Sequence, residues 1–219
     1  MGFLDTILST IFPEKCLGCG QRGVSFCKKC LESCSVALRE SARWIFPCYD
    51  YRHPYIKKSL WLFKYKGRRR LASVFADALY DKMLEELSDL STMENFHNPL
   101  LVPIPLSRKR LRERGYNQAE LVCAEILKIN DSRQGLKMKL ETKILSKSKD
   151  TEHQARIKDR RKRIENMRGT FMVTDQKSVR GKNIILVDDI LTTGATLSDA
   201  RRALRAAGAR KVIAFTIAH

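Results

Sequence analysis

The chain has 219 residues, of which 43% are hydrophobic, so it suits one folded domain with a small accessory module and is not a disordered chain. Lysine and arginine number 42 against 24 aspartate and glutamate residues, a formal net charge of +18. This excess predicts an anionic partner such as nucleic acid, a nucleotide or an anionic membrane, and a merely basic protein is the alternative. We expect no membrane-spanning helix, because no apolar run approaches the roughly 20 residues that a bilayer requires.

The start of the chain predicts an amphipathic helix. Its apolar positions, which recur at helical spacing, are Phe3, Leu4, Ile7, Leu8, Ile11 and Phe12. The segment lacks the basic start and the small-residue cleavage site of a signal peptide. We therefore expect a cytoplasmic protein whose N-terminal helix docks on a partner, which would place it peripherally at the inner membrane. In that compartment the seven cysteines are thiols or metal ligands rather than disulfides.

Two Cys-x-x-Cys pairs, Cys16 with Cys19 and Cys27 with Cys30, are separated by seven residues. A spacer of two residues turns the chain so that both sulfurs face one point, and two such pairs supply the four thiolates of a tetrahedral zinc site. The zinc ion is expected to be structural, since four sulfur ligands leave no open position for a substrate. Unligated thiols or a redox pair are the alternative, and Cys34 is a less well spaced substitute for Cys30.

The rest of the chain alternates predicted strands and helices. Strands are expected at 44–49, 98–103, 171–173, 184–187 and 212–217, and helices at 56–90 with a break near Gly67, 119–129, 151–167 and 195–207. The Lys-rich stretch 131–149 has no strong pattern. The alternation predicts an α/β fold whose parallel sheet is covered on both faces. We expect two parts, a helix and zinc module at 1–40 and the α/β domain at 41–219.

The strongest functional signal is the pair Asp188 and Asp189, which follows the apolar strand 184–187. A loop and the start of a helix come next, with the residues Leu191, Thr192, Thr193, Gly194, Ala195 and Thr196. Backbone N–H groups at a helix N-terminus bind phosphate, and threonine hydroxyls add donors. Carboxylates at a strand end accept hydrogen bonds from the hydroxyls of a ribose. The pattern predicts a ribose 5-phosphate pocket, and a helix cap with incidental acidic residues is the alternative.

The segment from Asn183 to Leu197 closely resembles the 5-phosphoribosyl-1-pyrophosphate (PRPP) motif of type I phosphoribosyltransferases. The resemblance implies the parallel-sheet phosphoribosyltransferase fold. It also implies that Asp188 and Asp189 hold the ribose hydroxyls, that the loop wraps the 5′-phosphate, and that Mg²⁺ accompanies PRPP and neutralises its diphosphate.

Further motifs follow one another in a fixed order. The cysteine pairs precede Leu62-Phe-Lys-Tyr-Lys-Gly67, Pro103-Ile-Pro105 with Arg114-Gly-Tyr-Asn-Gln-Ala119, a segment with Gln154, Asn166, Gly169 and Phe171, and the PRPP motif. This order resembles the ComF competence-protein family across essentially the whole chain. The resemblance implies an N-terminal zinc module and a role in natural transformation, with single-stranded DNA and the DNA-uptake machinery as partners.

Basic residues gather near these motifs. Arg108 and Lys109, on a predicted turn before the helix 119–129, are the candidates for neutralising pyrophosphate, and a solvated basic face is the alternative. The candidates for contact with single-stranded DNA are Lys64, Tyr65, Lys66, Arg114, Arg160, Arg161 and Arg163. Tyr65 is the candidate for base stacking, whereas core packing is the preferred interpretation of Trp61 and Phe63.

Two functions remain open from the sequence. The first is a PRPP-binding competence protein that handles single-stranded DNA, with the pocket as a sensor or anchor. The second is a phosphoribosyltransferase that transfers phosphoribose to an unidentified nitrogen acceptor and releases pyrophosphate. The fold alone does not choose between them, whereas release of pyrophosphate from PRPP does.

Overall fold

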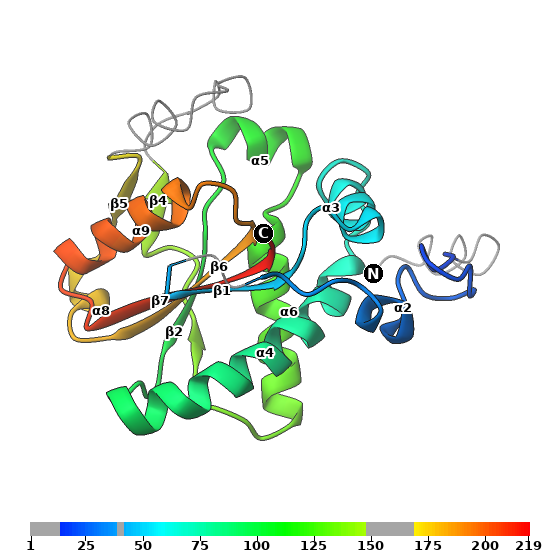
Figure 1. Cartoon of the computed structure of the whole chain (residues 1–219). Helices are drawn as coiled ribbons and strands as arrows, with labels where there is room; N and C mark the ends of the chain where they lie inside the picture. The colour runs from blue at the N-terminus through cyan, green and yellow to red at the C-terminus, as the bar shows by residue number, and fades with distance from the viewer. Residues whose placement is uncertain (1–13, 39–41, 148–168) are drawn as a thin grey trace.

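A five-stranded parallel sheet forms the centre of the chain in a computed structural model that describes residues 14–38, 42–147 and 169–219 (Figure 1). In spatial order the strands are β1 (Ile45–Tyr49), β7 (Lys211–Ala218), β6 (Asn183–Ile190), β2 (Leu100–Pro103) and β3 (Lys139–Leu140). The helices predicted at the N-terminus and at 151–167 lie outside the described residues.

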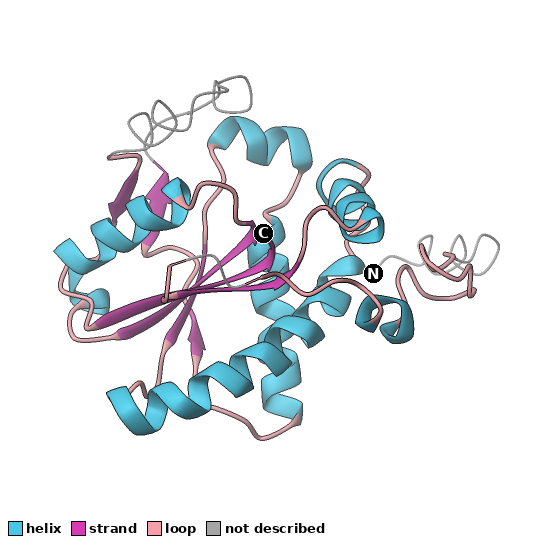
Figure 2. Cartoon of the chain, in the orientation of Figure 1, coloured by secondary structure: helices cyan, strands magenta, loops and turns pink. Residues whose placement is uncertain are grey.

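Both faces of the sheet are buried under helices (Figures 1 and 2). In β6, Ile185 and Val187 belong to the core that faces α3 (Pro54–Tyr65), α4 (Leu71–Glu94) and α6 (Gln118–Ser132). The alternate residues, Ile184 and Leu186, belong to the core under α9 (Ala195–Ala206). Because neither face meets water, the strand reads as one continuous apolar run, which is typical of parallel sheets.

The predicted strands and helices within the described residues are confirmed, with small shifts at their ends. Between α3 and α4 the chain breaks at Gly67, whose φ of +65° favours glycine. The prediction of a turn over 108–114 is wrong, because α5 (Arg108–Arg114) is a helix. Ser107 caps it by accepting from the N–H of Arg110 at 3.4 Å, and Gly115 ends it with φ +73°. This helix has no buried residue and therefore no apolar periodicity to detect.

Shorter elements complete the fold. They are α2 (Lys28–Glu32), α8 (Gln176–Val179), and the antiparallel pair β4 (Leu145–Lys147) and β5 (Phe171–Val173). The strands β3 and β4 both fall in the Lys-rich stretch, where no strand was predicted. The backbone N–H groups of Gly169, Thr170 and Phe171 all donate to the buried carboxylate of Asp199, at 2.8–3.1 Å. That carboxylate therefore anchors the start of β5 to α9.

The cysteine-rich segment packs on the same core as α4. Phe26, Leu31 and Cys34 are each at most 5% exposed within that core. The boundary expected after residue 40 falls in 39–41, outside the described residues. Across the described part of the chain, no helix combines the length and apolar character that crossing a membrane requires.

Candidate functional site

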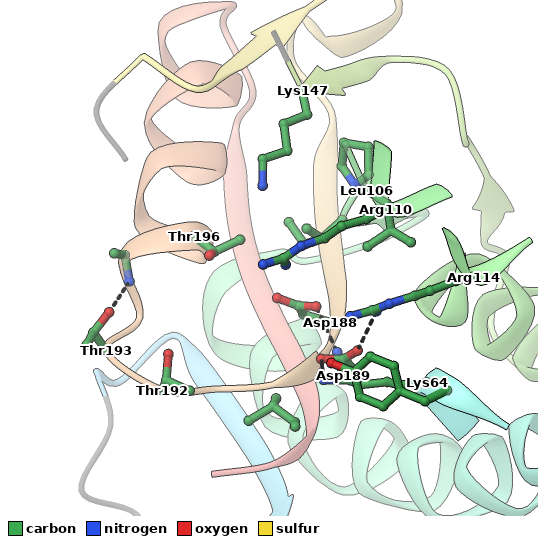
Figure 3. Close-up of a pocket in the computed structure, with 15 residues that line it drawn as sticks. Lys64, Leu106, Arg110, Arg114, Lys147, Asp188, Asp189, Thr192, Thr193 and Thr196 are labelled. Atoms are coloured by element: carbon green, nitrogen blue, oxygen red, sulfur yellow. Dashed lines mark hydrogen bonds and ion pairs between the residues drawn. The ribbon is translucent and has the colours of Figure 1, made fainter. Parts of the chain in front are cut away.

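A pocket of about 370 Å³ opens where β6 leaves the sheet (Figure 3). Its walls come from the ends of α3, β2, β4 and β6, from α5, and from the loop before α9. The residues that line it are Lys64, Tyr65, Ile104, Pro105, Leu106, Arg110, Arg114, Lys147, Asp188, Asp189, Ile190, Thr192, Thr193, Ala195 and Thr196. This position, beyond the carboxyl ends of parallel strands, is the usual ligand site of open α/β sheets.

The two predicted carboxylates lie together at the floor of this pocket. Asp188 accepts a hydrogen bond of 2.8 Å from the backbone N–H of Asp189. Burial, followed by the charge of Asp189, raises the pKa of Asp188 to about 7, although that N–H, Lys64 and Lys147 act in the opposite direction. A group with a pKa so close to neutrality makes the charge of the floor dependent on pH and on the nearby cations.

The predicted loop divides into lining and supporting residues. Thr192, Thr193, Ala195 and Thr196 line the pocket. Leu191 instead is 5% exposed, packs in the core under α9 and donates its N–H to Ala218 at 2.7 Å. Gly194 has φ +73° and begins α9, so a side chain there would strain the turn. The Oγ1 of Thr193 accepts from the N–H of Ala195 at 3.4 Å.

Helix α5 supplies the basic wall, although not through the residues predicted. Arg108 and Lys109 are exposed in its first turn and are not among the described residues that line the pocket. Arg110 and Arg114 line it instead, because residues four apart share one face of a helix. Lys147, at the end of β4, also reaches into the pocket and was not predicted. Arg108 and Arg112 have the same spacing of four, so the sequence alone could not indicate which face of α5 lines the pocket.

Three predicted DNA contacts, Lys64, Tyr65 and Arg114, line the pocket itself. The Nζ of Lys64 lies 2.7 Å from Oδ1 of Asp189, and both side chains are only 14% exposed. The Nη1 of Arg114 lies 4.0 Å from Oδ2 of the same carboxylate and donates to Gln118 at 2.8 Å. Lys64 and Arg114 therefore hold Asp189 from two elements that are far apart in the sequence.

A row of aromatic rings and cations runs along α3 to the mouth of the pocket, where it ends at Arg114 of α5, whose side chain is only 9% exposed. Trp61 is 48% exposed and Tyr65 is 60% exposed, and their ring centroids are 6.5 Å apart. Lys66 lies 5.3 Å from the Trp61 ring, and Arg114 lies 5.3 Å from the Tyr65 ring. We call these four residues the α3 row.

Core packing is therefore confirmed for Phe63, which is fully buried, and is wrong for Trp61. Trp61 lies on the side of α3 turned away from the core. The DNA candidates Arg160, Arg161 and Arg163 fall outside the described residues.

The four cysteines of the two pairs converge in space. The sulfur atoms of Cys16, Cys19, Cys27 and Cys30 all lie within 4.8 Å of one another, and those of Cys19 and Cys27 are 3.8 Å apart. A tetrahedron with metal–sulfur bonds of about 2.3 Å has sulfur–sulfur edges of about 3.8 Å. A Cβ on Gly18 would come within 2.7 Å of the Cys30 sulfur, so glycine is required there for the cysteines to close up.

The surroundings act in opposite directions on two of the four cysteines: hydrogen bonding to Cys27, followed by burial, raises the pKa of Cys30 to about 12, whereas that of Cys16 is lowered. Burial raises the pKa of Cys16, but backbone N–H groups, including one from Cys27 at 3.3 Å, outweigh it and lower the value to about 6. The substitute ligand Cys34 is outside the cluster: it is buried, its Sγ donates to the Cys30 carbonyl at 3.3 Å, and burial raises its pKa to about 11. Cys34 is therefore a core residue.

The comparisons with known proteins agree with this geometry. The family model "Phosphoribosyl transferase domain" matches residues 134–219, which include the acidic pair and the loop after it. The chain is 32% identical over 171 residues to "Competence protein ComFC" of Bacillus subtilis, a match that covers 74% of this chain and 59% of that relative. It is 28% identical to "Competence protein ComFC" of Streptococcus pneumoniae over 97% of this chain and 84% of the relative.

One further relative and one solved structure are also similar to parts of this chain. "DNA utilization protein YhgH" of Escherichia coli K12 is 26% identical over 82% of this chain and 74% of its own length. Among solved structures, a hypoxanthine phosphoribosyltransferase from Staphylococcus aureus is 14% identical over 66% of this chain and 62% of its own, with a TM-score of 0.38. With its parallel phosphoribosyltransferase-type sheet, its N-terminal cysteine cluster and these relatives, the chain belongs to the ComF family.

Proposed function

We propose that this protein binds PRPP in the pocket of Asp188 and Asp189 and handles single-stranded DNA during competence. The observation that carries the proposal is the convergence of an acidic pair, a helix N-terminus and four cations on one pocket. The names of its relatives, which are competence and DNA utilization proteins, supply the biological setting. We further propose that it acts in the cytoplasm beside the DNA-uptake machinery.

The chemistry of each wall supports PRPP. Asp188 and Asp189 offer acceptors for the ribose hydroxyls, and Thr192, Thr193 and Thr196 offer donors beside the N-terminus of α9 for the 5′-phosphate. A ribose that carries a phosphate at one end and a diphosphate at the other needs cations on its second side. Lys64, Arg110, Arg114 and Lys147 gather there. We therefore propose Arg110 and Arg114, in place of Arg108 and Lys109, as the residues beside the diphosphate.

Two metals complete the proposal. The diphosphate of PRPP would bring Mg²⁺, which offsets its charge when bound. The four sulfurs fit a structural zinc ion, since their spacing matches a tetrahedral shell and they leave no open position. The zinc module of residues 1–40 would then stabilise the fold without taking part in chemistry.

The α3 row supports the contact with single-stranded DNA. Strand-binding surfaces combine cations for the phosphates with aromatic rings for the bases. Trp61 and Tyr65 present exposed rings beside Lys66 and Arg114, and the row ends at the pocket. Because Arg114 contacts both Tyr65 and Asp189, we propose that PRPP in the pocket alters the affinity for the strand.

Calorimetry with PRPP and Mg²⁺ tests the pocket. The D188A/D189A variant is expected to bind PRPP at least 100-fold more weakly than the unaltered protein, because it loses both acceptors for the ribose hydroxyls. The matched control D77A/D81A removes two exposed carboxylates from α4 and should bind normally. Unchanged PRPP binding by D188A/D189A would refute the pocket assignment.

The second candidate function is phosphoribosyl transfer, favoured by the same pocket. In that reaction the bond from ribose C1 to the diphosphate breaks while a bond to the nitrogen acceptor forms, pyrophosphate leaves, and the acceptor loses a proton. Asp188 and Asp189 would steady the ribose as positive charge develops on it, and Arg110 and Arg114 would favour departure of the pyrophosphate. Pyrophosphate release from PRPP in the presence of nitrogen acceptors, lost in D188A/D189A, would establish this function over simple binding.

A further inference from the structure

A second hollow lies further along α9, beyond the turn that faces the pocket. It has a volume of about 290 Å³ and is lined by Trp44, Ser198, Arg201, Arg202 and Arg205. Of the described residues, none lines both this hollow and the pocket of Asp188. We call it the α9 cleft, and its walls consist mainly of arginine.

One arginine of the α9 cleft is held in place before any ligand arrives. The guanidinium carbon of Arg201 lies 4.5 Å from the centroid of the Trp44 ring, within the range of cation–π contact. Its Nε is buried and has no hydrogen-bond partner in the described part of the chain. Burial, followed by the charge of Arg205, lowers the pKa of Arg201. The Trp44 ring thus orients the guanidinium of Arg201, whose Nε still lacks a hydrogen-bond acceptor among the described residues.

The charge of the α9 cleft is only partly neutralised. Arg202 pairs with Asp199, whose carboxylate also accepts the N–H groups at the start of β5. Arg205 donates to the carbonyl oxygen of Ala209 at 2.7 Å, and a carbonyl removes no charge. Among the described residues no carboxylate forms an ion pair with Arg201 or Arg205. Two like charges that repel one another therefore line the cleft, and an anion placed between them would relieve the repulsion.

We propose that the α9 cleft is a nucleotide-binding site, which takes a phosphate on Arg201 and Arg205 and a base beside Trp44. Guanidinium groups bind phosphate through two parallel hydrogen bonds, and planar arginine and aromatic groups stack on bases. An acidic peptide would satisfy the charge but would leave the planar surface of the Trp44–Arg201 pair unused. The nucleotide is either free or one unit of a DNA strand.

For a DNA strand the inference rests on the proposed function, to which it adds a second point of contact. The α3 row and the α9 cleft would bind separate parts of one strand, and two linked contacts bind more tightly than either alone. Longer oligonucleotides should then gain affinity once they span both surfaces.

The chain contains two tryptophans, so the W61F variant leaves Trp44 as the only tryptophan reporter. Titration of W61F with oligothymidylates of increasing length and with free thymidine monophosphate should change its fluorescence to saturation. Adding R201Q/R205Q should weaken binding at least tenfold. With oligothymidylate it should also make the salt dependence of log K shallower by about 0.7, since the one phosphate contact that is lost to a single strand contributes about that amount.

Two further variants separate chemistry from net charge and from misfolding. R201K/R205K keeps both charges without the planar fork and should bind with intermediate affinity. K128Q/K137Q removes the same charge from the last turns of α6 and the loop that follows it, and should bind like W61F alone. If R201Q/R205Q binds thymidine monophosphate and oligothymidylate as well as W61F does, the proposal is overturned. An equal response of Trp44 to polyglutamate would also overturn it, in favour of an acidic peptide.

The outcomes distinguish this proposal from the proposed function. Tight strand binding with a silent Trp44 would eliminate the α9 cleft and leave the α3 row as the strand site. Absence of strand binding, with PRPP binding intact, would eliminate DNA handling, and the thymidine monophosphate titration would then decide on the α9 cleft as a site for free nucleotides.

Discussion

The cysteine cluster and the PRPP pocket are assembled in opposite ways. The four sulfurs come from residues 16–30, and their convergence depends on two short turns. The pocket draws on six elements, and its ion pair between Lys64 and Asp189 joins residues 125 positions apart. Residue spacing can locate a site whose residues are close together in the sequence. For a site built from distant segments, it locates only the wall that one segment supplies.

Loss of one cysteine ligand should have the largest effect. Cys16→Ser removes a thiolate from the cluster, and we expect bound zinc to fall well below one ion per chain. Because metal binding is coupled to folding, the free energy of unfolding should drop by roughly 3 kcal/mol or more, and Tm by about 6–12 °C. Metal analysis and thermal unfolding measure the two effects.

Cys34→Ser is the matched control, since Cys34 is equally buried but lies outside the cluster. It should keep its zinc and lose a smaller amount of stability. Equal zinc contents in the two variants would contradict the assignment of the ligands.

The turn of the first cysteine pair allows a finer test within the same module. Gly18→Ala would place a Cβ 2.7 Å from the Cys30 sulfur, so zinc affinity should fall about tenfold or more. Gly20→Ala meets no atom within 4 Å but occupies φ +77°, so it should cost about 1 kcal/mol of stability and leave zinc affinity unchanged. Competition with a zinc chelator compares the variants, and equal affinities would indicate that the cluster tolerates displacement of Cys30.

A smaller effect is expected at the pocket, where the contact that is removed joins residues far apart in the sequence. Lys64→Met removes the nearer of the two cations that hold Asp189, and we expect PRPP to bind about tenfold more weakly, or about 1.4 kcal/mol. Lys66→Met is the control, because Lys66 is exposed and lies against Trp61. Similar losses in both variants would indicate a general charge effect rather than positioning of Asp189.

Lys64→Met should also alter the pH dependence of PRPP binding. The pKa of Asp188 is raised to about 7, so its carboxylate becomes a full acceptor, and PRPP affinity should increase, as the pH rises through that value. Lys64 is one of the charges that lower this pKa, so in Lys64→Met the increase should move to higher pH. Calorimetry between about pH 6 and about pH 9 measures the shift, and Asp188→Asn should remove the increase that Asp188 causes.

The residue pattern was enough to predict the main strands and helices in their order, the convergence of the cysteine pairs, and the acidic pair before a Thr- and Gly-rich loop, but not α5, β3 or β4. Each predicted feature depends on contacts within a few residues or on an apolar strand buried on both faces, and such constraints leave a pattern in the chain.

Which cations reach the pocket depends on tertiary packing. Helix α5 buries no residue, so its sequence shows no periodicity, and the choice of Arg110 and Arg114 over Arg108 and Lys109 depends on how the helix sits against β6. Whether Trp61 or Phe63 enters the core depends likewise on which side of α3 meets the rest of the fold. These outcomes are set by packing between distant segments, which no local pattern records.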